Sequence, residues 1–119
     1  MGEKAAGFTV DAHFAGKPPQ VRKIYERLLD LLEKIGPVSE DPKKTAIHLV
    51  RESALAGVEV RREYLLLNLK TDYAIDSPRV ERVERLSANR YHTKVRLSAI
   101  AEVDGEVKRW LKDAYSLSG

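Results

Sequence analysis

The stretch from Lys43 to Lys70, KKTAIHLVRESALAGVEVRREYLLLNLK, contains three strand-like runs in succession. The runs extend over residues 46–51, 54–60 and 64–70, and each is rich in Leu, Val and Ile and bounded by charged or small residues. Short apolar runs separated by tight connections are typical of an antiparallel meander. We therefore expect this stretch to form the middle of a sheet.

The third run is apolar on both of its faces. Because side chains alternate along a strand, one face carries Leu65, Leu67 and Leu69. The opposite face carries Tyr64 and Leu66, so this strand is expected to be covered at least partly on both sides. Either a flanking segment of the same chain or a second copy of the protein is expected to provide that cover.

Length and composition indicate a single domain over residues 1–119. A chain of 119 residues is long enough to bury one core without disulfides or metal. The absence of cysteine excludes thiolate catalysis and cysteine-based zinc sites. The first ten residues lack the apolar core of a signal peptide, and no run approaches the roughly 18 apolar residues of a membrane span. We expect a soluble, cytoplasmic protein with no membrane partner.

Two amphipathic helices are predicted outside the meander. The first extends from Pro18 to Ile35, begins at two prolines, and ends at Gly36, with apolar residues at steps of three and four. The second begins near Ser98 or at Asp104, both of which are good cap residues, and runs to about Tyr115. Before them, residues 8–14 form either a short helix capped by Thr9 or an arm that packs on the sheet. After the first helix, residues 37–40 are expected to form a short edge strand, followed by a turn at residues 41–43.

The segment after the meander is ambiguous. Val80, Val83 and Leu86 lie three apart, as in a helical turn, so residues 78–83 are left open between helix and strand. Residues 83–87 are interpreted as a strand that turns at 88–90 and pairs with residues 91–97. The fold class is therefore α+β: an antiparallel sheet of about five strands with the Pro18–Ile35 helix and the C-terminal helix packed on one face. Trp110 and Leu28 should both be buried.

The segments FTVDAHFAGKPP, PKKTAIHLV, ALAGV, DSPRV, SANRYH and RWLKDAY together carry a family resemblance. Over nearly its whole length the chain resembles a small bacterial family, domain of unknown function 5655. The resemblance implies an α+β domain of this size that occurs alone or attached to other domains, some of them related to nucleases. It implies no established activity and no catalytic residue.

No catalytic, cofactor or metal motif is present in the sequence. His13, His48 and His92 lack a second ligand at metal-pair spacing, although His48 and His92 are expected on the same sheet face. Glu106 and Lys108 match the acid-x-lysine step of a nuclease core, but that core requires a strand and these residues fall on a predicted helix. We therefore predict no catalytic residues, no cofactor and no metal, and an enzyme is not favoured.

Basic residues are concentrated in one part of the chain. Nine basic and five acidic residues occupy positions 61–96, a net charge of +4, whereas the whole chain has +3. An anion-binding surface is hypothesised from Lys43, Lys44, Arg61, Arg62, Arg85, Arg90, Lys94 and Arg96. Stacking or polar contacts are hypothesised for His48, Tyr64, Tyr91 and His92. The alternative is an ordinary solvated surface, because charged residues also keep sheets from aggregating.

Two functions of different classes follow from these patterns. The first is an interaction domain that associates with itself as a homodimer, suggested by the two-sided apolar run at residues 64–69. The second is binding of a polyanion, such as nucleic acid, through phosphates and without sequence specificity, by the basic segment at residues 61–96.

Overall fold

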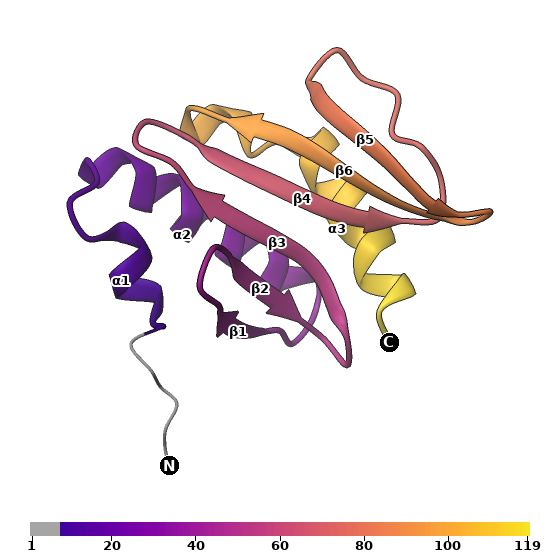
Figure 1. The fold of residues 1–119 in the computed structure, drawn as a ribbon, viewed down its shortest axis with the longest axis horizontal. Helices are drawn as coiled ribbons and strands as arrows, with labels where there is room; N and C mark the ends of the chain where they lie inside the picture. The colour runs from indigo at the N-terminus through magenta and orange to yellow at the C-terminus, as the bar shows by residue number, and fades with distance from the viewer. Residues whose placement is uncertain (1–7) are drawn as a thin grey trace.

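The computed structural model describes residues 8–119, which form one antiparallel sheet with two long helices on one side and a short helix at its margin (Figure 1). The strand order is β1-β2-β3-β4-β6-β5, so β1 and β5 are the two edges. The strands are β1 (Ser39–Pro42), β2 (Ile47–Val50), β3 (Ala54–Val60), β4 (Leu65–Thr71), β5 (Val80–Ser87) and β6 (Arg90–Leu97). The predicted fold class is confirmed, with six strands where about five were expected. The predicted meander forms β2, β3 and β4 near the centre.

The helices begin and end where local signals place them. In α1 (Val10–Phe14), the Thr9 hydroxyl accepts a hydrogen bond from the N–H of Ala12 at 3.0 Å. α2 (Pro19–Ile35) starts with proline, which needs no amide partner there. α3 (Gly105–Leu117) is capped by Asp104, whereas residues 100–102 form a separate 3-10 turn, η1 (Ile100–Glu102). Of the two predicted starts of the last helix, Asp104 is therefore the correct one.

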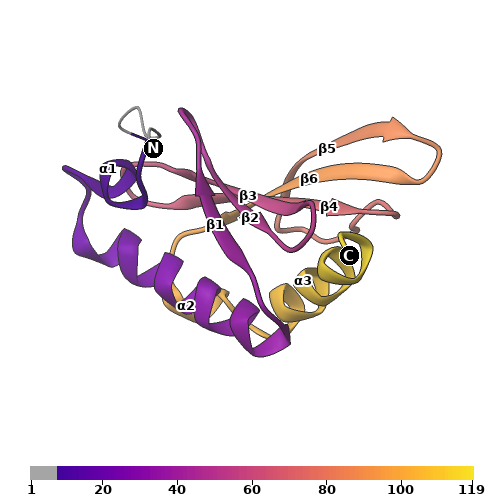
Figure 2. The same cartoon turned by 90° about the horizontal axis from the view of Figure 1, so that it is seen from below.

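The core lies between the sheet and the two long helices, which occupy the same side of the sheet (Figure 2). Leu28 of α2 is fully buried, and Trp110 of α3 is 4% exposed. They pack with the inward face of the sheet, including Leu65, Leu67 and Leu69, into one cluster. Each fully buried leucine contributes about 1.5–3 kcal/mol through removal of its surface from water. The predicted packing of both helices on one face is confirmed.

Residues 80–87 form a strand, although Val80, Val83 and Leu86 are spaced as in a helix. The β5–β6 register shifts between Val80 and Arg82, and again between Arg85 and Ser87. Each shift adds an extra residue to β5, as a β-bulge does. Val80 consequently packs against the core, and Leu86 lines a cavity with residues of α3, so both lie on the helix side of the sheet. The two bulges thus allow apolar residues spaced three apart to share one side of a strand.

The first edge strand lies further along the chain than predicted. β1 covers Ser39–Pro42 instead of residues 37–40. The turn correspondingly lies at residues 43–46, where the N–H of Lys43 donates to the carbonyl of Ala46 at 2.7 Å. Proline at the end of β1 is compatible with an edge strand, since it donates no ladder hydrogen bond.

The sheet face opposite α2 and α3, called the open face below, is not covered by any helix or strand of residues 8–119. Leu66 is nevertheless only 9% exposed. It lies in register between Glu59 and Arg96, and the Arg96 guanidinium sits 4.0 Å from the centre of the Tyr64 ring. Long polar side chains therefore provide cover that was expected from a flanking segment or a second copy. None of the described helices has the length and apolar character needed to cross a membrane.

Candidate functional site

A polar row crosses the open face from strand to strand. His48, Gly57, Asn68, Lys94 and Arg82 are neighbours in register on β2, β3, β4, β6 and β5. They alternate along their strands with the buried residues of the core, so the same period that buries the leucines presents these groups to solvent.

A cavity of about 260 Å³ lies on the open face near β5. Its lining consists of Asn68, Arg82, Glu84, His92 and Lys94. The Oδ1 atom of Asn68 is buried and has no hydrogen-bond partner within the described chain. The cavity thus combines two cations with one carboxylate, an imidazole and an amide. Such a set suits a small polar ligand.

His48 and His92 both lie on the open face, as predicted, but they do not meet. They belong to β2 and β6, with β3 and β4 between them, and His92 lies two residues along β6 from Lys94, which shares the register row of His48. Ordinary strand spacing and rise then separate them by about 16 Å. Within residues 8–119 there is no cluster of three His, Cys, Asp or Glu side chains that could hold a metal ion.

The two histidines share a cationic neighbour. Burial and the charge of Lys70, with a smaller effect of Lys43, lower the pKa of His48, and Asp41 acts weakly in the opposite direction. Burial and Lys70 likewise lower the pKa of His92, which Glu84 partly offsets. Both pKa values therefore lie below 6.5, the ordinary value for histidine, which favours the neutral imidazole at pH 7.

The topology divides the predicted anion-binding residues between two ends of the sheet. Lys43 and Lys44 form the β1–β2 turn, and Arg61 and Arg62 form the β3–β4 turn at the same end, close to Arg96. Arg85 and Arg90 flank the β5–β6 turn at the opposite end, about 20 Å away at the rise of a strand. Lys94 lies between the two groups.

Ion pairs neutralise half of these basic residues. Glu59 contacts Arg61 at 2.7 Å and Lys94 at 3.0 Å. Lys43 pairs with Asp41 at 3.1 Å, and Arg96 pairs with Glu81 at 3.0 Å. Three carboxylates, one of them shared by two cations, thus offset part of the expected positive charge. Arg85 and Arg90 instead donate to the nearby carbonyls of Ser87 and Asn89.

The predicted stacking residues do not share one surface. Tyr64 is covered by Arg96. Tyr91 faces the helix side, where the Arg85 guanidinium lies 6.0 Å from its ring centre, whereas His92 faces the open side. They therefore do not form a continuous platform for successive bases.

The most exposed apolar side chains of the sheet lie on β5, which sequence reasoning did not identify as a site. Val83 is 42% exposed and Leu86 is 51% exposed. Among residues 8–119, β5 pairs only with β6, so its outer edge is unpaired within this part of the chain. The β5–β6 hairpin extends past α3 (Figures 1 and 2). The repeat VERVERL at residues 80–86 is the signal in the sequence, but its spacing left residues 78–83 open between helix and strand and did not indicate an exposed apolar edge.

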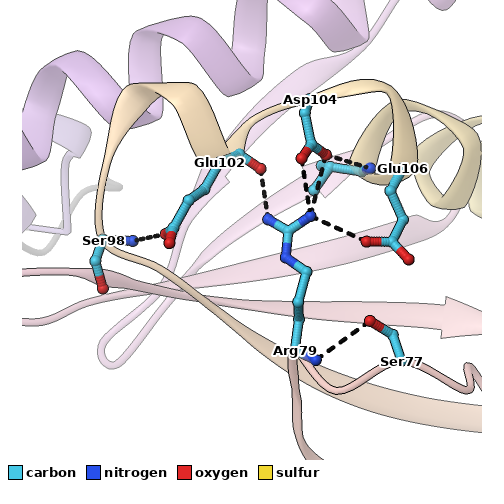
Figure 3. A network of polar contacts seen from close by, with 7 residues as sticks. Ser77, Arg79, Ser98, Glu102, Asp104 and Glu106 are labelled. Atoms are coloured by element: carbon cyan, nitrogen blue, oxygen red, sulfur yellow. Dashed lines mark hydrogen bonds and ion pairs between the residues drawn. The ribbon is translucent and has the colours of Figure 1, made fainter.

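A polar network holds the start of β5 in place (Figure 3). The guanidinium of Arg79 donates to Asp104 at 3.0 Å, to Glu106 at 3.1 Å and to the carbonyl of Glu102 at 2.6 Å. It also lies 5.7 Å from the centre of the Trp110 ring. Glu106, considered above as part of a nuclease-like step, is on helix α3 as predicted and serves this network.

A second cavity, of about 280 Å³, lies under the β5–β6 hairpin at the end of α3. Leu86 and Tyr91 line it from the hairpin, and Ala114 and Leu117 line it from the helix. Exposed apolar surface on β5 therefore continues into a hollow next to α3.

Comparison with known proteins gives one match. The model of the family described as Domain of unknown function (DUF5655) matches residues 10–118. No curated protein matches the chain, and no solved structure does.

Proposed function

Because the chain belongs to the DUF5655 family, for which no activity is established, we propose a function from its surface: a binding domain that associates with itself through β5. The observation that carries this proposal is the unpaired edge of β5 with its exposed Val83 and Leu86. An unpaired strand edge presents N–H and C=O groups that another strand can pair with.

The two edges of the sheet differ in how far they are protected. β1 has four residues and includes Pro42, two features that block the addition of a further strand. β5 has eight residues and no proline. The apolar side chains on β5 add a hydrophobic gain that a solvated edge strand would lack. These differences favour β5 over β1 as the contact.

Sedimentation velocity from micromolar to millimolar concentration tests this proposal. The wild type should show a mass that rises with concentration, and Val83→Lys should weaken the association. Ile100→Lys is the matched control, because Ile100 is also 42% exposed but belongs to η1 and not to β5. A wild type that stays monomeric throughout, or equal effects of the two substitutions, would overturn the proposal.

A second candidate function is polyanion binding at the end of the sheet that carries the β1–β2 and β3–β4 turns. It is supported by the convergence of two dibasic turns at that end. Lys44 and Arg62 form no ion pair with any residue from 8 to 119. They are therefore the residues whose charge is available for phosphates.

Titration of labelled single- and double-stranded DNA at two salt concentrations tests the second candidate. Binding should weaken with salt, and a Lys44→Glu, Arg62→Glu variant should have a smaller salt slope because it makes fewer phosphate contacts. Arg90→Glu, at the opposite end of the sheet, is the control. Absence of binding at low salt, or equal binding by the double variant, would exclude this function.

A further inference from the structure

The residues of β5 are arranged so that the strand is complementary to a second copy of itself. The segment Val80-Glu81-Arg82-Val83-Glu84-Arg85-Leu86 has Val83 at its centre. In an antiparallel pair with a two-fold axis at Val83, each residue before the centre faces the residue at the same distance after it. Val83 then faces Val83 of the second copy, and Arg82 faces Glu84 of the second copy.

We propose that two copies of the chain join edge to edge through antiparallel β5 strands with the two-fold axis at Val83, giving one continuous twelve-stranded sheet. This inference rests on the self-association proposed above and specifies its partner, direction and register.

The charges on the open face support this register. Arg82 and Glu84 both line the open-face cavity, so both project from the same side of β5. Opposite charges on directly facing residues of an antiparallel pair are stabilising, and like charges are destabilising. Shifting the axis to Arg82 would place Arg82 against itself, and shifting it to Glu84 would place two carboxylates together. The axis at Val83 avoids both like-charge contacts. It also keeps the helices of the two copies on the same side of the joined sheet.

The apolar residues support the same register on the helix side. Val80 packs against the core and Leu86 lines the cavity beside α3, so both share the side of Val83 because of the two bulges. The axis at Val83 places Leu86 of one copy near Val80 of the other. Val80, Val83 and Leu86 of the two copies would then pack against one another on the helix side.

The bulges also define the length of the contact. Regular pairing with β6 holds from Arg82 to Arg85, between the two register shifts. Bulges usually twist an edge away from further pairing, and charged residues usually repel a second strand. Here the regular segment contains the residues around the axis, and its charges alternate in sign. The bulges and the alternating charges therefore favour the antiparallel pair centred on Val83 and disfavour other strand pairings.

The paired strands would also bring the two open-face cavities together. Glu84 of the second copy would lie beside Arg82 at the rim of the first cavity. A ligand in that cavity would therefore contact groups from both copies, and dimerisation would change the charge next to Lys94 and His92.

Charge exchange tests the register by sedimentation at low salt. Arg82→Glu and Glu84→Arg each place like charges opposite one another in a homodimer, so each should raise the dissociation constant by about tenfold. An equimolar mixture of these two variants should recover the wild-type constant, since a heterodimer pairs opposite charges again. High salt should reduce the differences.

Disulfide formation provides a second measurement that does not depend on affinity. The chain has no cysteine, so Val83→Cys introduces a single thiol at the axis, where paired Cα atoms lie about 4.5–5.5 Å apart and can be bridged. Under oxidised glutathione this variant should form a covalent dimer rapidly. Leu86→Cys is the control, because its two thiols would be about 20 Å apart along the strands.

The outcomes separate the two proposals. A wild type that is monomeric throughout would end both the self-association and this register. A wild type that associates, with no recovery in the mixture and equal crosslinking of the two cysteine variants, would overturn the register alone. Recovery in the mixture, together with preferential crosslinking through Val83→Cys, would establish it.

Discussion

Arg79 donates to Asp104 at 3.0 Å, across a sequence separation of 25 residues, and so ties the start of β5 to the first turn of α3. The same guanidinium reaches Glu106 and the carbonyl of Glu102 (Figure 3). One side chain thereby holds together the two carboxylates at the start of the helix.

Replacing Arg79 should destabilise the protein. Arg79→Met leaves two neighbouring carboxylates without their common cation and removes the donor of the Glu102 carbonyl. We expect the free energy of unfolding to fall by about 1–3 kcal/mol, measured by urea denaturation. Arg109→Met, on helix α3, is the control. Equal losses for both variants would contradict the assigned role of Arg79.

The same substitution should change the ionisation of Asp104. Burial acts to raise the pKa of Asp104, but the hydrogen bond from the N–H of Val107 and the contact with Arg79 outweigh it, so the pKa is lowered. Arg79→Met should therefore raise this pKa, as measured by carbon NMR of the carboxyl group. Because the pKa is lowered in the folded protein, Asp104 contributes to the free energy of unfolding fully above pH 3.8, its ordinary pKa. This contribution is lost as the pH falls through the lowered value.

Gly36 should not tolerate a side chain. Its φ of 174° is extended backbone that any residue adopts, so the constraint is space. A Cβ at Gly36 would collide with the ring and hydroxyl of Tyr115, and that hydroxyl donates to the Pro37 carbonyl at 2.9 Å. Gly36→Ala should cost about 1–3 kcal/mol of unfolding free energy through overpacking.

Gly105 offers a matched control for this prediction. A Cβ there meets no atom within 4 Å, and Gly105 is the first residue of α3. Gly105→Ala should therefore leave stability unchanged or raise it by up to about 1 kcal/mol, since alanine favours a helix. Thermal unfolding of both variants gives the comparison. A similar melting temperature for the two would show that Tyr115 yields at no cost.

Lys70 should control the titration of both open-face histidines. Lys70→Met removes a positive charge that lowers the pKa of His48 and of His92, so both values should rise, while burial continues to hold them down. NMR titration of the imidazole protons between pH 4 and pH 8 measures this. A rise at only one histidine would mean that Lys70 does not act on both.

The sign of the pH dependence of stability follows from these lowered values. In the unfolded chain the histidines have a pKa of 6.5, which is higher than their pKa in the folded protein. Their contribution to the free energy of unfolding is therefore fully present above pH 6.5 and is lost as the pH falls through the lowered values. Lys70→Met should make this decrease shallower. Urea denaturation at pH 5 and at pH 7 compares the two proteins.

Much of the fold was predictable from spacing. The helix from Pro19 to Ile35 and the buried faces of β4 and β6 follow from residues a few positions apart, since each period describes one element. The same method was wrong about the bounds of β1. It also left residues 78–83 unresolved, because two bulges in β5 mimic a helical repeat. A bulge is defined by the partner strand, which spacing along one strand does not reveal.

The candidate site was predictable only in part. The placement of His48 and His92 on one face followed from alternation and is confirmed. The balance of charge did not follow, because Glu59 pairs with Lys94 across 35 positions of sequence. A charge count along the chain gives +4 for residues 61–96 and takes no account of such partners.

By itself, the sequence determined the class of the fold, the two long helices and the side of each central strand that is buried, because these depend on local periodicity and on the hydrophobic effect. Only the tertiary structure decided the order of the strands. That order leaves β5 with an unpaired edge among residues 8–119, gathers the cavity around Asn68 and brings carboxylates beside half of the predicted basic residues. The physical reason is that neighbours in a sheet are chosen by the packing of the whole chain, whereas each strand carries information only about its own two faces.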